Sequence, residues 1–410
     1  MKYVVIAILS GISTDQGALA SYRANIELER NYSFSPEMSA VILKHKILER
    51  TDSMPEVKGN YLRNAWYAAA WSDEIGREPL ARTFLDEPVV LFRDTDGAPV
   101  ALTDRCPHRF APLSKGKLVG DAIECPYHGL RFGSDGGCVY NYHGPVPKAA
   151  SVDCHPVMER YGLAWIWMGD AEQAHEDKLP DFGTFCTDDD FAVARGYLYV
   201  AGNYQLAVDN LLDLTHAQFL HPALGNANSS EHSTFTMKSK GSTVWAKYMF
   251  SGEPVTPFTK MVWDSPSETC DRSASMRWEA PSNLLLEVAV MECGGSSDDG
   301  AILIPSTHFL TPETSKTAHY FWMNARNARI EDEALTEMFR QATDSAFRFE
   351  DEPMIALVQG RMGDSDFDDL KPVFLTTDRA AGKARQILKQ LIEAERSPVT
   401  PELKAVKTGT

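Results

Sequence analysis

The sequence predicts an α+β protein, in which an N-terminal antiparallel β domain is followed by a larger domain of strands and helices. Three observations lead to this fold class. Short strand-like runs broken by Gly, Pro and Asp fill residues 60–170, strand-like and helical segments mix beyond residue 180, and the chain ends in helical stretches. The 410 residues, 43% of them apolar, suffice for two packed domains.

The N-terminal β domain is predicted over residues 59–175. The segment PVVLFRDTDGAPVALTD (88–104) has the pattern of two strands joined by a hairpin turn at Asp96-Gly97. LAWIWMGD (163–170) alternates like a further strand. We therefore expect many short antiparallel strands in this domain.

The second domain is predicted over residues 176–400, followed by a tail at 401–410. After a strand-like segment at 196–205, LAVDNLLDLTHAQFLH (206–221) has helical periodicity. Further strand-like segments are expected at residues 242–250, 283–293 and 318–325. Two amphipathic helices are then expected at residues 331–362 and 379–396.

Residues 1–58 are expected to be an extension upstream of the folded domains. Lys2 followed by YVVIAIL and a later GALA loosely resembles a short signal peptide, which is the alternative interpretation. Strongly patterned sequence begins just after Met54, so this methionine is a plausible alternative start of the protein.

Composition excludes several classes of function. The net charge of −17 argues against nucleic acid, which requires clustered Lys and Arg, and gives no attraction to an anionic membrane. No apolar run reaches the roughly 18–20 residues of a membrane helix. The seven cysteines are odd in number and irregularly spaced, so we expect free thiols in a reducing compartment, the cytoplasm.

The first metal-binding pattern is Cys106-x-His108, followed after sixteen residues by Cys125-x-x-His128. In a [2Fe–2S] centre of the Rieske type, two Cys bind one iron and two His bind the other. A Cys₂His₂ zinc site takes the same ligands. Zinc ligands usually come in like pairs, whereas each loop here mixes Cys with His, and this favours the cluster.

These residues and their flanks, CPHRFAPLSKG and ECPYHGLRF, resemble the Rieske domain of ring-hydroxylating and demethylating oxygenases. The resemblance implies that Cys106, His108, Cys125 and His128 are the cluster ligands. The five other cysteines match no such pattern and are expected to be packed or partly exposed thiols.

A second pattern contains two more histidines. On a helix, Asp213 and His216 would share a face, and His221 lies five residues further on, where the helix should end before Pro222. Two histidines here can supply the nitrogen half of a 2-His-1-carboxylate iron site, although core or surface histidines explain most such pairs.

NLLDLTH-x₄-H is also similar to the mononuclear iron motif of the same oxygenase family. That similarity implies that His216 and His221 bind Fe(II). It assigns Asp213 as a bridging carboxylate, which links a ligand histidine to a Rieske histidine of a neighbouring subunit. Carboxylates behind a metal-bound imidazole orient it, so the role is physically reasonable.

The third iron ligand must be a carboxylate from elsewhere in the chain. FRFEDEPMIALVQGRM offers Glu350, Asp351 and Glu352. The family takes its ligand from a C-terminal helix at this point, and the flanking residues favour Asp351, with Glu350 as the alternative. An ordinary solvated acidic patch would look the same.

Within the family the chain looks most similar to the vanillate O-demethylase branch, on RNAWYAAAWSDEI, DNLLDLTH and HFLTPET. The likeness runs from Asn64 to about Arg396. It implies a Rieske domain followed by a helix-grip catalytic domain, and assembly as a head-to-tail homotrimer. Electrons would come from NAD(P)H through a separate reductase, directly or through a ferredoxin. The chain has no Rossmann or flavin motif of its own.

Two further features concern the substrate. His308 stands where related enzymes place a pocket histidine, so it is a candidate to bind a substrate carboxylate or phenol; a packed, hydrogen-bonded histidine is equally consistent. The aromatic run Tyr320-Phe321-Trp322 could line an aromatic pocket, but such runs are more often strand core.

The resemblance therefore implies an O₂-dependent monooxygenase that O-demethylates a vanillate-like or lignin-derived aromatic acid and releases formaldehyde. The alternative is a Rieske oxygenase that hydroxylates or dihydroxylates another aromatic substrate, because pocket shape and not fold decides the substrate. An electron carrier without catalysis is disfavoured, since it would leave Asp213, His216, His221 and Asp351 without a role.

Overall fold

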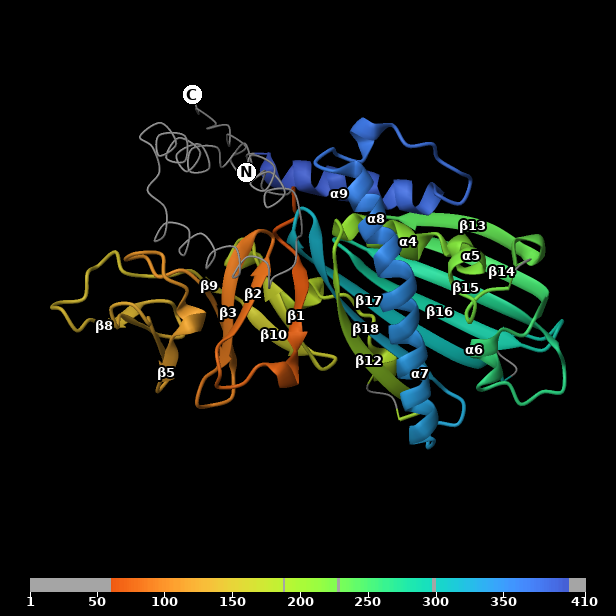
Figure 1. The fold of residues 1–410 in the computed structure, drawn as a ribbon, viewed down its shortest axis with the longest axis horizontal. Helices are drawn as coiled ribbons and strands as arrows, with labels where there is room; N and C mark the ends of the chain where they lie inside the picture. Colours follow the sequence, from red (N-terminus) through yellow and green to blue (C-terminus); the bar gives the residue numbers. More distant parts are fainter. Residues whose placement is uncertain (1–59, 187–188, 227–228, 297–299, 398–410) are drawn as a thin grey trace, which may run out of the picture. The chain divides into compact units, whose positions relative to one another are not determined.

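The computed structural model of the chain describes residues 60–186, 189–226, 229–296 and 300–397 (Figure 1). The predicted N-terminal extension and the tail at 401–410 lie outside these residues. In the described parts of the chain, no helix combines the length and the apolar character that crossing a membrane requires.

Three small antiparallel sheets make up the N-terminal β domain of the described chain. The predicted turn at Asp96-Gly97 is confirmed: it joins β3 to β4, with Gly97 at φ 84°. The sheets are β1 (Trp66–Trp71), β11 (Leu163–Trp167) and β10 (Val157–Arg160); β2 (Leu80–Phe84), β3 (Glu87–Arg93), β4 (Pro99–Thr103) and β9 (Cys154–His155); and β5 (Lys117–Val119), β6 (Ala122–Glu124), β7 (Arg131–Phe132) and β8 (Cys138–Tyr140).

A seven-stranded antiparallel sheet forms the centre of the second domain, and a long helical segment crosses it (Figure 1). Together with the β domain it confirms the predicted α+β class. In sheet order the strands are β12 (Ala192–Val200), β18 (Thr317–Arg326), β17 (Ile302–Thr314), β16 (Asn283–Met291), β15 (Thr269–Glu279), β14 (Thr243–Pro254) and β13 (Ser233–Lys240). The helices are α4 (Tyr204–Leu212), α5 (Ala217–Leu220), α6 (Pro257–Lys260), α7 (Glu333–Ala346), α8 (Glu352–Met362) and α9 (Arg379–Arg396).

The two domains are joined by one apolar core and by direct hydrogen bonds. A single cluster of buried side chains contains residues of β1, β3 and β11 together with residues of β17 and β18. The Thr311 hydroxyl donates to the Ala68 carbonyl at 2.6 Å, and the Leu85 amide donates to the Pro312 carbonyl at 2.9 Å. Burial of this kind fixes the β domain against β17, the strand that carries His308.

The predicted continuous helix over 206–221 is wrong. Helix α4 ends at Leu212, Asp213 has extended backbone angles, and a 3₁₀ turn, η6 (Leu214–His216), precedes the short α5. The carboxylate of Asp213 accepts a hydrogen bond from the backbone amide of Thr215 at 2.9 Å. Asp favours such caps over a helix interior, so it starts a new turn instead of continuing the old one.

The two C-terminal helices are confirmed, with one unpredicted feature. α9 spans residues 379–396 as expected. The stretch predicted at 331–362 is helical throughout residues 333–362, but a π-helical turn, η8 (Phe347–Asp351), separates α7 from α8. Such turns occur often at functional sites, and this one carries Glu350 and Asp351.

Candidate functional site

Two loops of the β domain hold a cysteine each in the same backbone arrangement. In both loops the cysteine carbonyl accepts a hydrogen bond from the backbone amide of the residue four positions later. The Phe110 amide donates to the Cys106 carbonyl at 2.8 Å, and the Gly129 amide donates to the Cys125 carbonyl at 3.0 Å. Phe110 and Gly129 have φ angles of 60° and 73°. A Cβ on Gly129 would lie 2.6 Å from the Tyr142 ring, and the positive φ also favours glycine here. The loops after β4 and β6 are therefore a matched pair.

The structure brings the four predicted cluster residues together. Cys106 and Cys125 are buried, and the ring centroids of His108 and His128 lie 4.5 Å apart, nearer the surface. Burial raises the pKa of the Cys106 thiol to about 11, so a thiolate here needs a nearby cation. Nδ1 of His128 is buried without a hydrogen-bond partner among the described residues. Two thiols and two imidazoles so placed fit a [2Fe–2S] cluster.

His216, His221 and Asp351 place three metal-binding atoms in a triangle. Nε2 of His216 lies 3.2 Å from Nε2 of His221 and 3.5 Å from Oδ1 of Asp351, and His221 Nε2 lies 3.2 Å from the same oxygen. Two ligands at right angles, each about 2.1 Å from a metal, lie about 3 Å apart. The triangle therefore fits one face of an octahedral ion and leaves the opposite face open.

The π-helical turn η8 places two adjacent carboxylates around one imidazole. Glu350 contacts Nδ1 of His221 at 2.6 Å, whereas Asp351 faces Nε2 of the same ring. Glu350, the alternative third ligand, thus lies behind the histidine and not inside the triangle. A carboxylate in that position orients a metal-binding imidazole.

Hydrogen bonds to other parts of the chain hold Asp351 in the triangle and keep Glu352, the remaining acidic candidate, away from it. Asn210, in the last turn of α4, donates to Oδ1 of Asp351 at 2.9 Å and fixes its rotamer. Glu352 instead accepts the backbone amide of Ala201 at 3.1 Å, away from the histidines. Of the three acidic residues in this segment, only Asp351 faces both histidines.

Asp213 contacts His216 through its backbone. Nδ1 of His216 lies 2.5 Å from the Asp213 carbonyl oxygen, while the carboxylate accepts the Thr215 hydroxyl at 2.6 Å and the Thr377 hydroxyl at 3.1 Å. The carbonyl fixes the tautomer of His216, so its Nε2 is the nitrogen available to a metal. Bridging by the Asp213 carboxylate to a neighbouring subunit stays a prediction.

The electrostatics of the triangle favour a bound cation. Burial lowers the pKa of His216, which keeps its imidazole in the neutral, metal-binding form. Burial acts in the same direction on His221, but Asp351 and Glu350 outweigh it and raise the pKa of that ring. Two carboxylates that favour a proton on His221 also favour a metal ion beside it.

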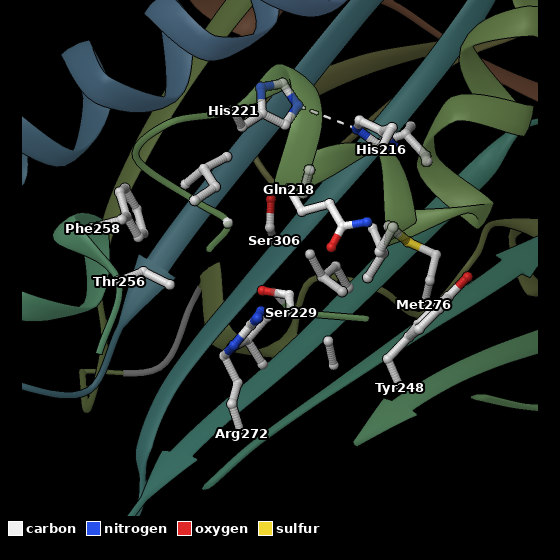
Figure 2. Close-up of a pocket in the computed structure, with 18 of the residues that line it drawn as sticks. His216, Gln218, His221, Ser229, Tyr248, Thr256, Phe258, Arg272, Met276 and Ser306 are labelled. Carbon is white, nitrogen blue, oxygen red and sulfur yellow. Dashed lines mark hydrogen bonds between the residues drawn. The ribbon is translucent and has the colours of Figure 1, made fainter. Parts of the chain in front are cut away.

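The triangle borders a pocket of about 160 Å³ between the large sheet and the segments that carry the ligands (Figure 2). Alternate residues of four neighbouring strands face this pocket, as the two-residue period of a strand requires. These are Tyr248 and Phe250, Arg272, Ala274 and Met276, Leu286 and Val288, and Ile304, Ser306 and His308. The walls are therefore mainly apolar, with a few polar groups.

His308 both lines the pocket and belongs to a hydrogen-bonded pair. Its Nδ1 lies 2.7 Å from the Tyr320 hydroxyl, and its Nε2 is buried without a partner among the described residues. Burial lowers the pKa of His308 to about 3, so the ring is neutral. Phe321 and Trp322 belong to the apolar clusters and do not line the pocket, so the aromatic run is strand core.

Sequence reasoning did not single out two residues of this site, Asn210 and Arg272. Asn210 lies three positions before Asp213 in the motif that carries the histidines, and this proximity was a usable signal. Arg272 lies in a strand without any motif, so only the tertiary structure places it in the pocket.

Comparison with known proteins agrees with this geometry. A model of the Rieske [2Fe–2S] domain matches residues 65–155, and a model of the vanillate O-demethylase oxygenase C-terminal domain matches residues 200–394. The oxygenase component of chloroacetanilide N-alkylformylase from Rhizorhabdus wittichii is 38% identical over 348 residues, which cover 82% of this chain and 97% of that protein. The oxygenase component of dicamba O-demethylase from Stenotrophomonas maltophilia is 35% identical, over 82% of this chain and 99% of that protein.

A vanillate O-demethylase oxygenase subunit from a Pseudomonas species is 30% identical, over 81% of this chain and 95% of that protein. The crystal structure of dicamba monooxygenase bound to 3,6-dichlorosalicylic acid superposes with a TM-score of 0.78 at 35% identity, over 82% of this chain and 99% of that one. The chain therefore belongs to the Rieske non-haem iron oxygenases, as an oxygenase component with a [2Fe–2S] cluster and a mononuclear iron that uses O₂ and electrons from a separate reductase.

Proposed function

We propose that this oxygenase O-demethylates a methoxylated aromatic acid. The observation that carries the proposal is the mainly apolar pocket of about 160 Å³ beside the triangle of His216, His221 and Asp351. An apolar cavity of roughly 150 Å³ holds one benzene ring, so this pocket suits a single substituted ring better than a linked biaryl.

In this proposal the two ligand sets have separate tasks. Cys106, His108, Cys125 and His128 hold the cluster, and His216, His221 and Asp351 hold Fe(II). The cluster supplies single electrons and the iron supplies the O₂ chemistry. Apolar pocket walls exclude water and hold the methoxy group at the open face of the triangle.

The overall reaction balances as a monooxygenation. One oxygen atom of O₂ enters the methyl C–H bond, the other leaves as water, and two electrons and two protons are consumed. The resulting hemiacetal loses its methyl carbon as formaldehyde and leaves a phenol. We propose that the neutral His308 hydrogen-bonds the ring substituents, and that Asp213 links the iron site to the cluster of the next subunit.

The assembly completes the proposal. We infer a head-to-tail homotrimer that receives electrons from NAD(P)H through its reductase, with or without a ferredoxin, in the cytoplasm. Support for O-demethylation comes from the relatives named for dicamba and vanillate. A second candidate, N-dealkylation, is favoured by the 38% identical relative named for chloroacetanilide, and ring hydroxylation is the remaining alternative.

Formaldehyde release tests the proposal. Purified, metal-loaded protein is reduced chemically and given O₂ with vanillate, syringate, the methoxybenzoates or an N-alkoxyalkyl anilide. Formaldehyde together with the matching phenol from an acid supports O-demethylation. An aldehyde from the anilide alone supports N-dealkylation, and a hydroxylated product without aldehyde supports ring hydroxylation.

A further inference from the structure

The pocket contains a permanent cation on the side away from the metal-binding triangle. Among the described residues that line the pocket, Arg272 of β15 is the one Lys or Arg. Figure 2 shows its side chain extending towards Ser229, whereas His216 and His221 lie across the pocket. Most of the exposed wall surface of the pocket is apolar, so a charge placed here acts strongly on a charged group of a bound ligand.

Two contacts hold the guanidinium and leave one edge available. Nε of Arg272 donates to the Glu253 carboxylate at 2.5 Å, and the guanidinium carbon lies 4.0 Å from the centre of the Phe250 ring. Glu253 is fully buried. Neither terminal nitrogen of Arg272 has a protein hydrogen-bond partner among the described residues, and neither is buried from solvent.

An irregularity in β14 builds this arrangement. The pairing of β14 with β15 shifts between Phe250 and Glu253, and Gly252 in the bulge has φ 61°. Regular alternation would turn Phe250 and Glu253 to opposite faces of the sheet, but the bulge brings both to Arg272. A bulge that redirects a side chain beside a pocket is typical of functional sites.

We propose that Arg272 binds the anionic group of the substrate, so that the enzyme selects an aromatic ring with a carboxylate or sulfonate remote from the alkyl group that is oxidised. The inference rests on the proposed function, because it concerns the same pocket. The two terminal nitrogens present parallel N–H groups, which match a pair of anionic oxygens. Glu253 neutralises the guanidinium while no substrate is bound.

The competing explanation is a structural ion pair that closes the end of the pocket. The two explanations predict different ligand dependence. An anion subsite distinguishes an acid from its uncharged amide, whereas a structural pair affects both ligands equally. Binding is therefore measured without turnover, by calorimetry on the iron- and cluster-loaded protein, with 4-methoxybenzoate, 3,4-dimethoxybenzoate, 4-methoxybenzenesulfonate and the matching carboxamides and sulfonamide.

We expect the wild-type protein to bind at least one acid more tightly than its amide. Arg272→Gln should weaken that acid about ten- to a hundredfold and leave the amide within about twofold. Because this variant leaves Glu253 buried without a counter-charge, the paired variant Arg272→Gln/Glu253→Gln removes both charges together and should show the same loss. Comparison of the carboxylate ligands with the sulfonate ligand shows which anion fits the Arg272 subsite better.

Arg195 provides a matched control. It also pairs with a carboxylate, at 2.6 Å from Asp73, and lies 4.7 Å over the Trp71 ring, but it does not line the pocket. Arg195→Gln should leave the preference for the acid unchanged. Equal weakening of acid and amide by the paired variant, or no preference in the wild type, would overturn the proposal. If the Arg272 variants lose the preference for the acid but the wild-type protein releases no formaldehyde, the inference about Arg272 stands and O-demethylation is rejected.

Discussion

Glu350 and Asp351 are neighbours in η8, yet their carboxylates contact opposite nitrogens of the same imidazole, that of His221. Asp351 therefore faces the proposed metal position, and Glu350 stands behind His221, the proposed ligand. This difference assigns distinct consequences to two substitutions one position apart in the chain.

Removal of Asp351 should empty the mononuclear site. Asp351→Ala takes away one corner of the triangle and leaves only two imidazoles, so iron should fall from about three to about two atoms per chain while the visible spectrum of the cluster persists. Glu352→Ala, whose carboxylate contacts a backbone amide instead, is the control and should keep its iron. Unchanged iron in Asp351→Ala would remove Asp351 from the site.

Glu350→Gln should weaken the iron site without abolishing it. The amide oxygen still accepts a hydrogen bond from Nδ1 of His221, but the negative charge that strengthens the ligand is lost. Substitutions behind a metal ligand typically cost about 10–100-fold in affinity. Iron titration by calorimetry should show that loss, with full occupancy at high iron. If Glu350 were the ligand itself, this variant would stay empty and Asp351→Ala would bind iron.

At the scale of elements, α9 is anchored to the helix that leads into the iron motif. Arg385 of α9 contacts the Asp209 carboxylate of α4 through Nε at 2.9 Å and Nη2 at 2.5 Å, and donates to Gln205 at 3.1 Å. Asp213 lies four positions after Asp209. The pair therefore fixes the end of α4 from which the ligand-bearing turns begin.

Breaking this pair should destabilise the protein measurably. Arg385→Met leaves the Asp209 carboxylate partly buried without its cation, at a cost of about 2–4 kcal/mol in the free energy of unfolding. Lys389→Met on the same helix removes an exposed lysine 3.9 Å from Asp368 and should cost less than about 0.5 kcal/mol. Urea unfolding of both variants measures the difference; equal midpoints would show that Arg385 does not anchor α9.

The sequence predicted those elements and site residues that local patterns encode, and missed those that packing determines. The mixed Cys and His spacing and the periodicity of 379–396 are local properties, so the four cluster residues and α9 could be named from sequence. The break at Asp213 was missed because helical periodicity continues across it, and only the Asp cap interrupts it. The π-turn and the position of Arg272 follow from packing between segments distant in the chain, which no local pattern encodes.

At the scale of the whole folded unit, the two metal sites belong to separate regions of one chain. The predicted cluster ligands lie in the loops after β4 and β6, and Figure 1 shows the β5–β8 sheet on the far side of β1–β3 from the large sheet. Beside those loops, Phe110 and Tyr127 are 71% and 63% exposed, so the cluster end presents apolar surface. This surface is compatible with the proposed delivery of electrons to the iron of a neighbouring subunit.

Asp213→Asn should interrupt that delivery and spare both metal sites. Asparagine can keep the hydrogen bond to the Thr215 amide, so the turn and the backbone contact to His216 should survive. Iron content and the cluster spectrum should match the wild type. Stopped-flow mixing of reduced protein with substrate and O₂ should show cluster oxidation slowed by orders of magnitude, and wild-type rates would contradict a bridging role.

Mixed oligomers test the route between subunits directly. Cys106→Ser removes a predicted cluster ligand and Asp351→Ala removes a predicted iron ligand, so oligomers of either variant alone should be inactive.

When the two variants are co-expressed with different affinity tags and purified through both tags, the product contains only mixed rings. In a head-to-tail trimer that contains both variants, one of the three junctions joins an intact cluster to an intact iron site in the next subunit. Product formation at about that fraction of the wild-type rate supports transfer between subunits. Mixed oligomers that contain both metals but form no product place the route within one chain, because no chain in them has both sites.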